Sequence, residues 1–317
     1  MKKIVSLVLA LMLCLSCVSA LAAEAWTVTC PWAPSGVAAM VNQKAASLST
    51  TYSQDYVLVA NAEKGDTATI NSWLTKYTEA DPQMCFIGEG MFGITAILDP
   101  ERMNFTYDDF KYVENLYSSI FVASARKELG ITSIDALKAY LEEGNQIMVG
   151  TNGATGSEAF LAAALIGAMG YGDQFYLIPY ESAAEAAQAV TRGEVDIAVS
   201  HQSQILETWQ QGGVDVFAAF DGEPIAQGPF KGVEGVGQYG YPYFRNRCFI
   251  FAKAGADEQK IADLKALYAQ ILTDEEMVDW LNNTMLLEAD MMTEEEVIAH
   301  IDNVKNIVDE YYDLVAE

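Results

Sequence analysis

Apolar runs of strand length alternate along this chain with stretches in which apolar residues recur every three or four positions. The first runs predict strands at residues 26–30, 56–60 and 84–88. Between them, helical spacing predicts helices at residues 37–48 and 67–77. A repeated strand–helix order predicts a mainly parallel sheet with helices on both faces.

The same alternation restarts after two consecutive apolar stretches within residues 112–125. The strands are expected at residues 146–150, 176–179, 195–200 and 214–219, and the helices at residues 133–141, 155–169, 182–191 and 203–210. The fold class is therefore α/β with two lobes, and the second lobe is predicted to occupy residues 123–247.

The rest of the chain contains one more strand and three helical patterns. Residues 222–243 are rich in glycine and proline and predict an irregular connection, and residues 248–252 predict a strand. The helical patterns lie at residues 257–272, 274–282 and 294–315. Because they have no sheet of their own, we expect them to cover the first lobe, which becomes discontinuous over residues 24–122 and 248–317.

Two crossings of the chain, near residues 121–125 and 247–252, are expected to join the lobes and to leave a cleft between them. Ligands of open α/β sheets bind beyond the carboxyl ends of the strands. This organisation is typical of secreted solute-binding proteins.

The N-terminal segment has the features of a secretory signal. Lys2 and Lys3 precede an apolar run, and small residues follow up to Ala22. We expect cleavage near Ala22 or Ala23, so that residues 1–23 are a signal peptide and the protein works at the periplasmic or extracytoplasmic face. Lipid anchoring at Cys17 is the alternative, but the leucine usual three residues upstream is missing.

The charge of the chain excludes several partners. Without Lys2 and Lys3, 16 basic residues stand against 44 acidic ones, so the formal charge falls from −26 to −28. Nucleic acid and anionic lipid are poor partners for such a surface.

The cysteines and histidines do not indicate a metal site. Cys30, Cys85 and Cys248 lie in apolar or strand-like contexts, which favours three buried thiols over one disulfide. The chain has only two histidines and no spacing typical of zinc ligands, so no metal and no cofactor is expected.

The segment GTNGATGSEAF, residues 150–160, follows a predicted strand and precedes a helix. Thr155 and Glu158 have the spacing of a capping box, which predicts that the helix begins at Gly156. The segment has no lysine and matches neither phosphate-loop pattern, so it offers amides and hydroxyls that suit a carboxylate. These candidate ligand-binding residues are Thr151, Asn152, Gly153, Thr155, Gly156 and Ser157. The alternative is a tight strand-to-helix turn without a ligand.

Three other predicted strand ends carry small or polar residues. In CPWAPSGVAAM, Ser35 or Gly36 opens a helix, and Pro34 stiffens its entry. Gly88 and Glu89 end the third strand, and His201 follows a strand of the second lobe. We expect these ends to face one cleft.

Several segments resemble the extracytoplasmic receptors of tripartite tricarboxylate transporters, the Bug or TctC type. PWAPSGVAAM resembles the PFxPGGxxD opening of that family, and IMVGTNGATGSEAFLAA its strand–GSxGxGSxxHLA segment. LIPYESAAEAAQAVTRGEVDIAVSHQSQI is similar to the family's VPYKGxxxAxxDLLGGxVDxxF pattern, and GVEGVGQYGYPYF to its TxxExGxPxF pattern. The resemblance runs in the family's order over residues 27–296.

This resemblance implies a bilobal fold of the type II periplasmic-binding-protein class. It also implies that the two glycine-containing loops bind a ligand carboxylate through backbone amides, at Pro34, Ser35 and Gly36 and at the loop after residue 150. Tyr180 and His201 become candidates for the far end of the ligand. The receptor would be a monomer that hands its ligand to membrane permease subunits.

Departures from the family pattern leave the identity of the ligand open. The family's second loop glycine is Ser35 here, and its aspartate falls at Ala39. The family's NxPGAGG segment reads NAEKGDTAT. Because the chain is strongly acidic, an amino acid fits as well as a di- or tricarboxylate or an aromatic acid, although screening confines the repulsion of anions to about 8 Å.

Two rival functions remain. A hydrolase is disfavoured because no GxSxG or HExxH motif occurs, and Ser200 and Ser203 are adjacent to His201 only along a turn. A receptor that feeds a sensor protein would have the same cleft, so the sequence does not separate it from a transport receptor.

Overall fold

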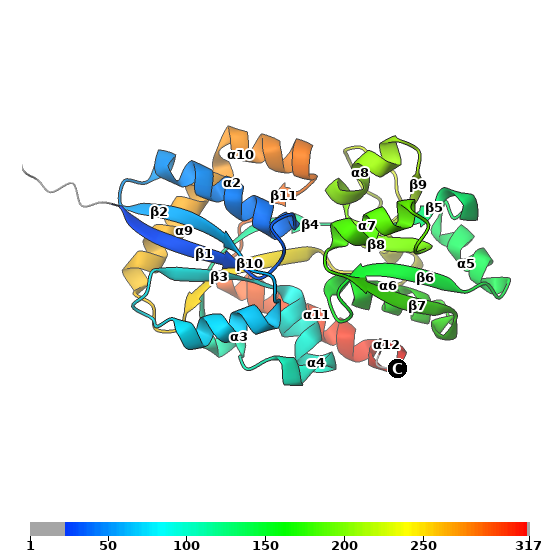
Figure 1. The fold of residues 1–317 in the computed structure, drawn as a ribbon, viewed down its shortest axis with the longest axis horizontal. Coiled ribbons are helices and arrows are strands. Elements are labelled where there is room, and N and C mark those ends of the chain that lie inside the picture. The colour runs from blue at the N-terminus through cyan, green and yellow to red at the C-terminus, as the bar shows by residue number, and fades with distance from the viewer. Residues whose placement is uncertain (1–22, 316–317) are drawn as a thin grey trace, which may run out of the picture.

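The computed structural model describes residues 23–315, which form two lobes side by side (Figure 1). Lobe 1 contains a six-stranded sheet of order β11-β4-β10-β3-β1-β2, and lobe 2 a five-stranded sheet of order β7-β6-β8-β5-β9. The strands are β1 (Glu24–Cys30), β2 (Tyr56–Ala62), β3 (Gln83–Gly88), β4 (Phe110–Ser119), β5 (Phe121–Arg126), β6 (Ile147–Asn152), β7 (Phe175–Tyr180), β8 (Ile197–His201), β9 (Val214–Ala219), β10 (Asn246–Lys253) and β11 (Glu288–Ala289).

Helices flank both sheets, as the strand–helix alternation predicts. They are α2 (Val37–Tyr52), α3 (Thr67–Lys76), α4 (Ala96–Leu98), α5 (Ile134–Glu142), α6 (Ser157–Ala168), α7 (Ala183–Thr191), α8 (Gln202–Gln210), α9 (Glu258–Thr273), α10 (Glu275–Asp279), α11 (Glu294–Glu310) and α12 (Tyr312–Val315). The predicted α/β fold class is confirmed.

The two sheets share one topology. The strand that enters from the other lobe is β10 in lobe 1, where it lies between β3 and β4, and β5 in lobe 2, where it lies between β8 and β9. In lobe 1, β1 pairs in parallel with β2 and β3, whereas β10 pairs antiparallel with β3 and β4. In lobe 2, β5 likewise pairs antiparallel with β8 and β9. The expectation of mainly parallel sheets is confirmed for β1–β4 and for β6–β9, which run in one direction within each sheet. The crossing strands β10 and β5 run antiparallel to them, because each arrives from the opposite end.

The chain crosses between the lobes at two short connections. Only Ile120 separates β4 from β5, and Phe121 already pairs with His201 of lobe 2. The return crossing ends where Asn246 pairs with Ser119 of lobe 1. The predicted boundaries after residues 122 and 247 lie two residues inside β5 and β10.

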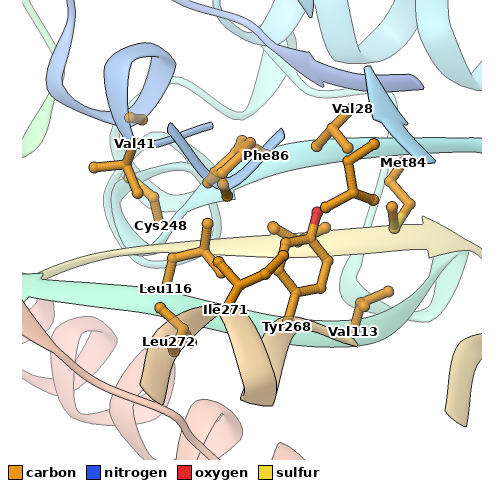
Figure 2. Close-up of a cluster of buried hydrophobic side chains, with 14 of the residues drawn as sticks. Val28, Val41, Met84, Phe86, Val113, Leu116, Cys248, Tyr268, Ile271 and Leu272 are labelled. Carbon is orange, nitrogen blue, oxygen red and sulfur yellow. The ribbon is translucent and has the colours of Figure 1, made fainter. Parts of the chain in front are cut away.

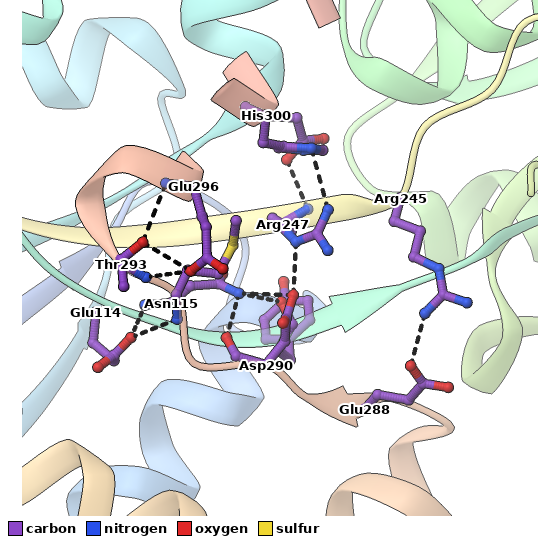
Figure 3. A network of polar contacts seen from close by, with 12 residues as sticks. Glu114, Asn115, Arg245, Arg247, Glu288, Asp290, Thr293, Glu296 and His300 are labelled. Carbon is purple, nitrogen blue, oxygen red and sulfur yellow. Dashed lines mark hydrogen bonds and ion pairs between the residues drawn. The ribbon is translucent and has the colours of Figure 1, made fainter. Parts of the chain in front are cut away.

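Charged side chains tie the return crossing to the C-terminal segment of lobe 1 (Figure 3). Arg247 Nε donates to Asp290 Oδ2 over 2.7 Å, and Arg245 Nη1 donates to Glu288 Oε2 over 2.7 Å. Asn115 Nδ2 of β4 donates to the Asp290 carbonyl over 2.6 Å. Charge-assisted bonds of this kind hold the crossing strand in a defined position.

One buried cluster of lobe 1 lies between its sheet and the helices α2, α9 and α10, and Figure 2 shows part of it. Val28 and Phe86 from the strands pack with Tyr268 and Ile271 from α9, and all four are fully buried. Burial of such side chains stabilises a fold by roughly 1.5–3 kcal/mol each. The prediction that the final helices cover lobe 1 holds for α9 and α10.

The last long helix, α11, contacts both lobes. Val297 and Ile301 join an aromatic cluster of lobe 1, whereas Val304 and Val308 pack in the core of lobe 2. The short α12 continues toward α6 (Figure 1). Helix α11 therefore covers lobe 1 as expected and in addition packs against lobe 2, because its buried stripe is long enough to reach both cores.

The structure tests the prediction about the thiols, whereas the predicted signal peptide lies almost entirely outside the described residues. Cys30, Cys85 and Cys248 are free and buried, which confirms three buried thiols. Within residues 23–315, no helix is both long and apolar enough to cross a membrane. The predicted signal peptide and Cys17 lie outside the described residues, apart from residue 23 at the signal's end.

Candidate functional site

A cavity of about 530 Å³ lies between the two lobes. The carboxyl ends of β3, β6, β7 and β8 contribute to its walls through Gly88, Asn152, Tyr180 and His201. Its volume lies within the range typical of small-molecule sites. The strand ends that the sequence predicts to face one cleft therefore meet at this cavity.

The lobe 1 wall contains the start of α2. Gly36 is the N-cap residue, no side chain caps the helix, and its first turn has no acidic residue. The first helical hydrogen bond runs from the Met40 amide to the Gly36 carbonyl, so the amides of residues 37–39 precede it. Gly36, Val37 and Ala38 line the cavity, and such a helix start favours an anion.

Pro34 and Ser35, which the sequence nominates for the same loop, do not line the cavity. Both are exposed to solvent. Trp32 and Ala33 line it instead. The turn closed by the hydrogen bond from the Gly36 amide to the Ala33 carbonyl places the tip of the loop outside the cavity.

The glycine-containing loop of lobe 2 supplies the opposite wall. Asn152, Gly153, Thr155, Gly156 and Ser157 line the cavity. The Thr151 side chain is fully buried, and its hydroxyl donates to the Gly153 carbonyl over 2.8 Å, so Thr151 shapes the loop.

The predicted capping box at Thr155 and Glu158 is absent. Helix α6 begins at Ser157, its N-cap residue is Gly156, and no side chain caps it. Thr155 Oγ1 accepts a hydrogen bond from Arg102 Nη1 over 2.9 Å. Because Thr155 lies one residue before the N-cap, its hydroxyl serves a contact with lobe 1 and Glu158 is left free of a capping role.

Glu89, at the end of β3, is fully buried and accepts hydrogen bonds from three groups. Ser157 Oγ and Asn246 Nδ2 donate to its Oε1 over 3.0 and 2.9 Å, and the Arg247 amide donates to its Oε2 over 2.8 Å. Burial raises the pKa of Glu89, while these donors favour its ionised form. Glu89 thus links lobe 1, lobe 2 and the return crossing.

Glu158 is a second buried carboxyl in the cavity wall. Its residue is 5% exposed, and burial raises its pKa to about 8, with the nearby Glu89 charge adding to the effect. The Asn152 side chain and the Glu158 amide act in the opposite direction. An acidic side chain therefore occupies the first turn of α6, whereas the first turn of α2 has none.

Tyr180 and His201, the candidates for the far end of a ligand, both line the cavity. His201 Nδ1 lies 2.7 Å from Ser119 Oγ, and the His201 amide donates to Gln204 Oε1 over 3.2 Å. Burial lowers the pKa of His201 to about 3, so its ring is neutral at physiological pH. His201 can offer hydrogen bonds but no charge.

Several polar residues of the cavity wall were not found from the sequence. Among them are Lys64, Asp66, Arg102 and Asn246. Arg102 Nη2 lies 3.1 Å from Asp66 Oδ2, and Lys64 pairs with Glu181 of lobe 2. Lys64 and Asp66 belong to the segment NAEKGDTAT, which departs from the family pattern. That departure is the only signal in the sequence that could have pointed to them. Arg102 ends the short 3-10 helix Pro100–Arg102 and Asn246 is the first residue of β10, and neither belongs to a motif.

The described part of the chain shows no cluster of three His, Cys, Asp or Glu side chains that could hold a metal ion. The cavity instead combines backbone amides, hydroxyls and buried carboxyls. This arrangement can bind and orient a small polar molecule.

The family model described as "Tripartite tricarboxylate transporter family receptor" matches residues 54–306. The chain belongs to this family. Membership in this receptor family implies an extracytoplasmic location. None of the curated proteins is a detectable sequence match for the receptor.

Solved structures share the fold of the receptor at low sequence identity. MatC (Rpa3494) from Rhodopseudomonas palustris with bound malate is 17% identical, with a TM-score of 0.76 over 92% of this chain and 98% of that one. Rpa4515 of R. palustris with adipate is 14% identical, with a TM-score of 0.80 over 92% and 96%. The periplasmic binding protein BugD is 15% identical, with a TM-score of 0.78 over 92% and 98%. Family and fold are those of solute-binding proteins, which are not enzymes.

Proposed function

We propose that the receptor captures a small organic carboxylate between its two lobes and delivers it to the membrane permease subunits of a tripartite tricarboxylate-type transporter. The observation that carries this proposal is the uncapped start of α2 in the cavity wall, at Gly36. Free amides at a helix start bind carboxylates without a cationic side chain. The loop of residues 152–157 covers the cavity from the other lobe.

Contacts between the lobes support a mechanism of closure around the ligand. Arg102 of lobe 1 donates to Thr155 of lobe 2, and Ser157 of lobe 2 donates to Glu89 of lobe 1. Both lobe 2 residues belong to the loop that lines the cavity. A ligand held by both walls favours the closed arrangement, so binding and closure are coupled.

Two solved structures of this fold are described with bound carboxylates, malate and adipate, which supports a carboxylate as the ligand class. Both anions are small enough for a cavity of about 530 Å³. The proposal needs neither a cofactor nor covalent chemistry. The receptor acts as a monomer in this proposal.

A thermal-shift screen of residues 24–317 tests the ligand class. The compounds are mono-, di- and tricarboxylates, aromatic acids, amino acids and neutral sugars. A ligand at a hundred times its dissociation constant stabilises the native state by about 2.7 kcal/mol, which raises the melting temperature measurably. Stabilisation confined to compounds with a carboxylate supports the proposal, and stabilisation by sugars alone, or by no compound, contradicts it.

A further inference from the structure

The cavity wall contains more acidic than basic side chains. Arg102 pairs with Asp66, and Lys64 pairs with Glu181. Two further wall carboxyls, Glu89 and Glu158, are at least 95% buried, because their exposed fractions are 0% and 5%. Among the described residues no lysine, arginine or histidine forms an ion pair with either. An anion with two or three charges would meet this acidic wall.

The two buried carboxyls differ in how their oxygens are satisfied. Three donors from other residues surround Glu89, so its charge is compensated within the protein. Glu158 has only the Asn152 side chain and its own amide to favour the ionised form. A buried carboxylate with so few donors is destabilised unless a donor or a cation reaches it.

Another wall residue has an acceptor atom without any donor. Asn246 is 7% exposed and lines the cavity, and its Nδ2 donates to Glu89. That bond fixes the orientation of the amide, and Asn246 Oδ1 has no hydrogen-bond partner in the described part of the chain. The wall thus contains two buried acceptor groups, at Glu158 and Asn246, that a hydrogen-bond donor on a ligand would satisfy.

We propose that Glu158 forms a subsite for a positively charged nitrogen, so that the ligand of this receptor is a small amino-carboxylic acid. This inference rests on the proposed function, because it places the carboxylate of the same ligand at the start of α2. The ammonium group then supplies the cationic partner that an ionised Glu158 lacks within the described residues, and Asn246 Oδ1 is a second, neutral acceptor in the same cavity wall. The apolar part of the ligand packs against wall residues such as Trp32 and Met91.

The asymmetry between the two helix starts supports this polarity. The first turn of α2 has no acidic residue, and the first turn of α6 contains Glu158. When Glu158 is ionised, as it is next to an ammonium group, its carboxylate occupies the positive end of α6 and competes with a ligand carboxylate for it. The anionic end of the ligand is therefore assigned to lobe 1 and the cationic end to lobe 2.

Matched ligand pairs test the subsite by isothermal titration calorimetry. Each pair shares a carbon skeleton and differs by one ammonium group: glutamate with glutarate, aspartate with succinate, and leucine with 4-methylpentanoate. Putrescine supplies ammonium groups without a carboxylate. We expect an amino acid to bind at least about tenfold more tightly than its partner without nitrogen, because the partner leaves a buried acceptor unpaired.

Two variants connect this preference to one side chain. Glu158→Gln removes the charge at constant size and is expected to abolish the difference within the pair. Glu207→Gln is the matched control, because Glu207 is an exposed residue of α8 in lobe 2 outside the cavity wall. If Glu158→Gln does not unfold cooperatively, Glu158→Ala takes its place and is likewise expected to abolish the difference. Glu158→Asp keeps the charge and is expected to keep the preference.

The outcomes separate this inference from the proposed function. Equal affinities within every pair for the unchanged receptor, or a preference that survives in Glu158→Gln, overturn the subsite and leave carboxylate capture standing. Binding of putrescine that depends on Glu158, without binding of any carboxylate, keeps the subsite and overturns the proposed function. If no compound binds, both are overturned.

Discussion

The hydroxyl of Ser157 donates a hydrogen bond to Oε1 of Glu89 over 3.0 Å, and this bond joins the first turn of α6 in lobe 2 to the end of β3 in lobe 1. Both residues line the cavity, and Glu89 also accepts from Asn246 at the return crossing. The groups that surround the cavity are therefore the same groups that hold the lobes together. A change at this contact should alter affinity through closure.

Ser157→Ala removes one donor from the buried Glu89 carboxyl. Hydrogen bonds to charged groups contribute about 1.5–3 kcal/mol. We expect the dissociation constant of the ligand found in the screen to rise about tenfold or more, since tenfold corresponds to about 1.4 kcal/mol. Ser47→Ala, on the exposed surface of α2, is the control. Equal affinities of Ser157→Ala and the control would show that the contact does not stabilise the closed form.

Gly156→Ala tests the approach of the backbone at the start of α6. A Cβ at Gly156 would lie 2.9 Å from the Asn152 carbonyl oxygen, so the loop has to move. We expect binding to weaken by at least about tenfold, while urea unfolding stays cooperative. Gly156→Val enlarges the obstruction and should abolish binding.

Gly172→Ala is the matched control for this loop, because a Cβ there meets nothing within 4 Å. It should bind the ligand like the unchanged receptor. If Gly156→Ala keeps full affinity in the same titration, the start of α6 does not contribute to the ligand site.

Glu158→Gln should change the pH dependence of stability in the absence of ligand. Burial raises the pKa of Glu158 from 4.5 to about 8. Below pH 4.5 the carboxyl is protonated in both the folded and the unfolded chain. As the pH rises from 4.5 to 8, the unfolded chain loses the proton while the folded chain keeps it, so the free energy of unfolding falls by about 1.4 kcal/mol per pH unit.

The comparison of the receptor with Glu158→Gln isolates this group. Glu89, Asp66 and the Cys248 thiol face Glu158 and remain in both proteins. Urea unfolding between pH 4.5 and 8.5 should therefore show the variant gaining stability over the receptor as the pH rises. Curves that stay parallel over this range would mean that Glu158 keeps an ordinary pKa.

Phe251→Ala should destabilise lobe 1. Phe251 is fully buried in β10, and its ring centroid lies 5.8 Å from that of Phe92 and 5.6 Å from that of Phe110. Truncation of a buried phenylalanine costs about 3–5 kcal/mol. Urea denaturation measures the loss, and Val59→Ala, at a side chain that is 43% exposed in β2, should cost much less. Similar losses for the two variants would contradict the role of this aromatic cluster.

The sequence predicts most of the local structure because periodicity is a local property. The runs at residues 26–30 and 84–88 lie within β1 and β3, and the glycine-containing segment lies between β6 and α6. Of the thirteen nominated ligand-binding residues, all except Pro34, Ser35 and Thr151 line the cavity. The position of these residues at the ends of predicted strands indicated that they would meet, since parallel strands of one sheet end at the same edge.

What the sequence by itself determined is the order of strands and helices, the two α/β lobes and the loops that meet between them, because apolar spacing and turn residues act over a few positions. Only the tertiary structure decided which distant groups share those loops. Glu89 meets Asn246, and Arg102 meets Thr155, although 157 and 53 positions separate them along the chain. The hydroxyl of Thr155 therefore bonds to lobe 1, and Glu158 turns from an expected cap into a buried carboxyl of the cavity. Burial and the pairing of charges depend on which lobes come together, and no local pattern records that.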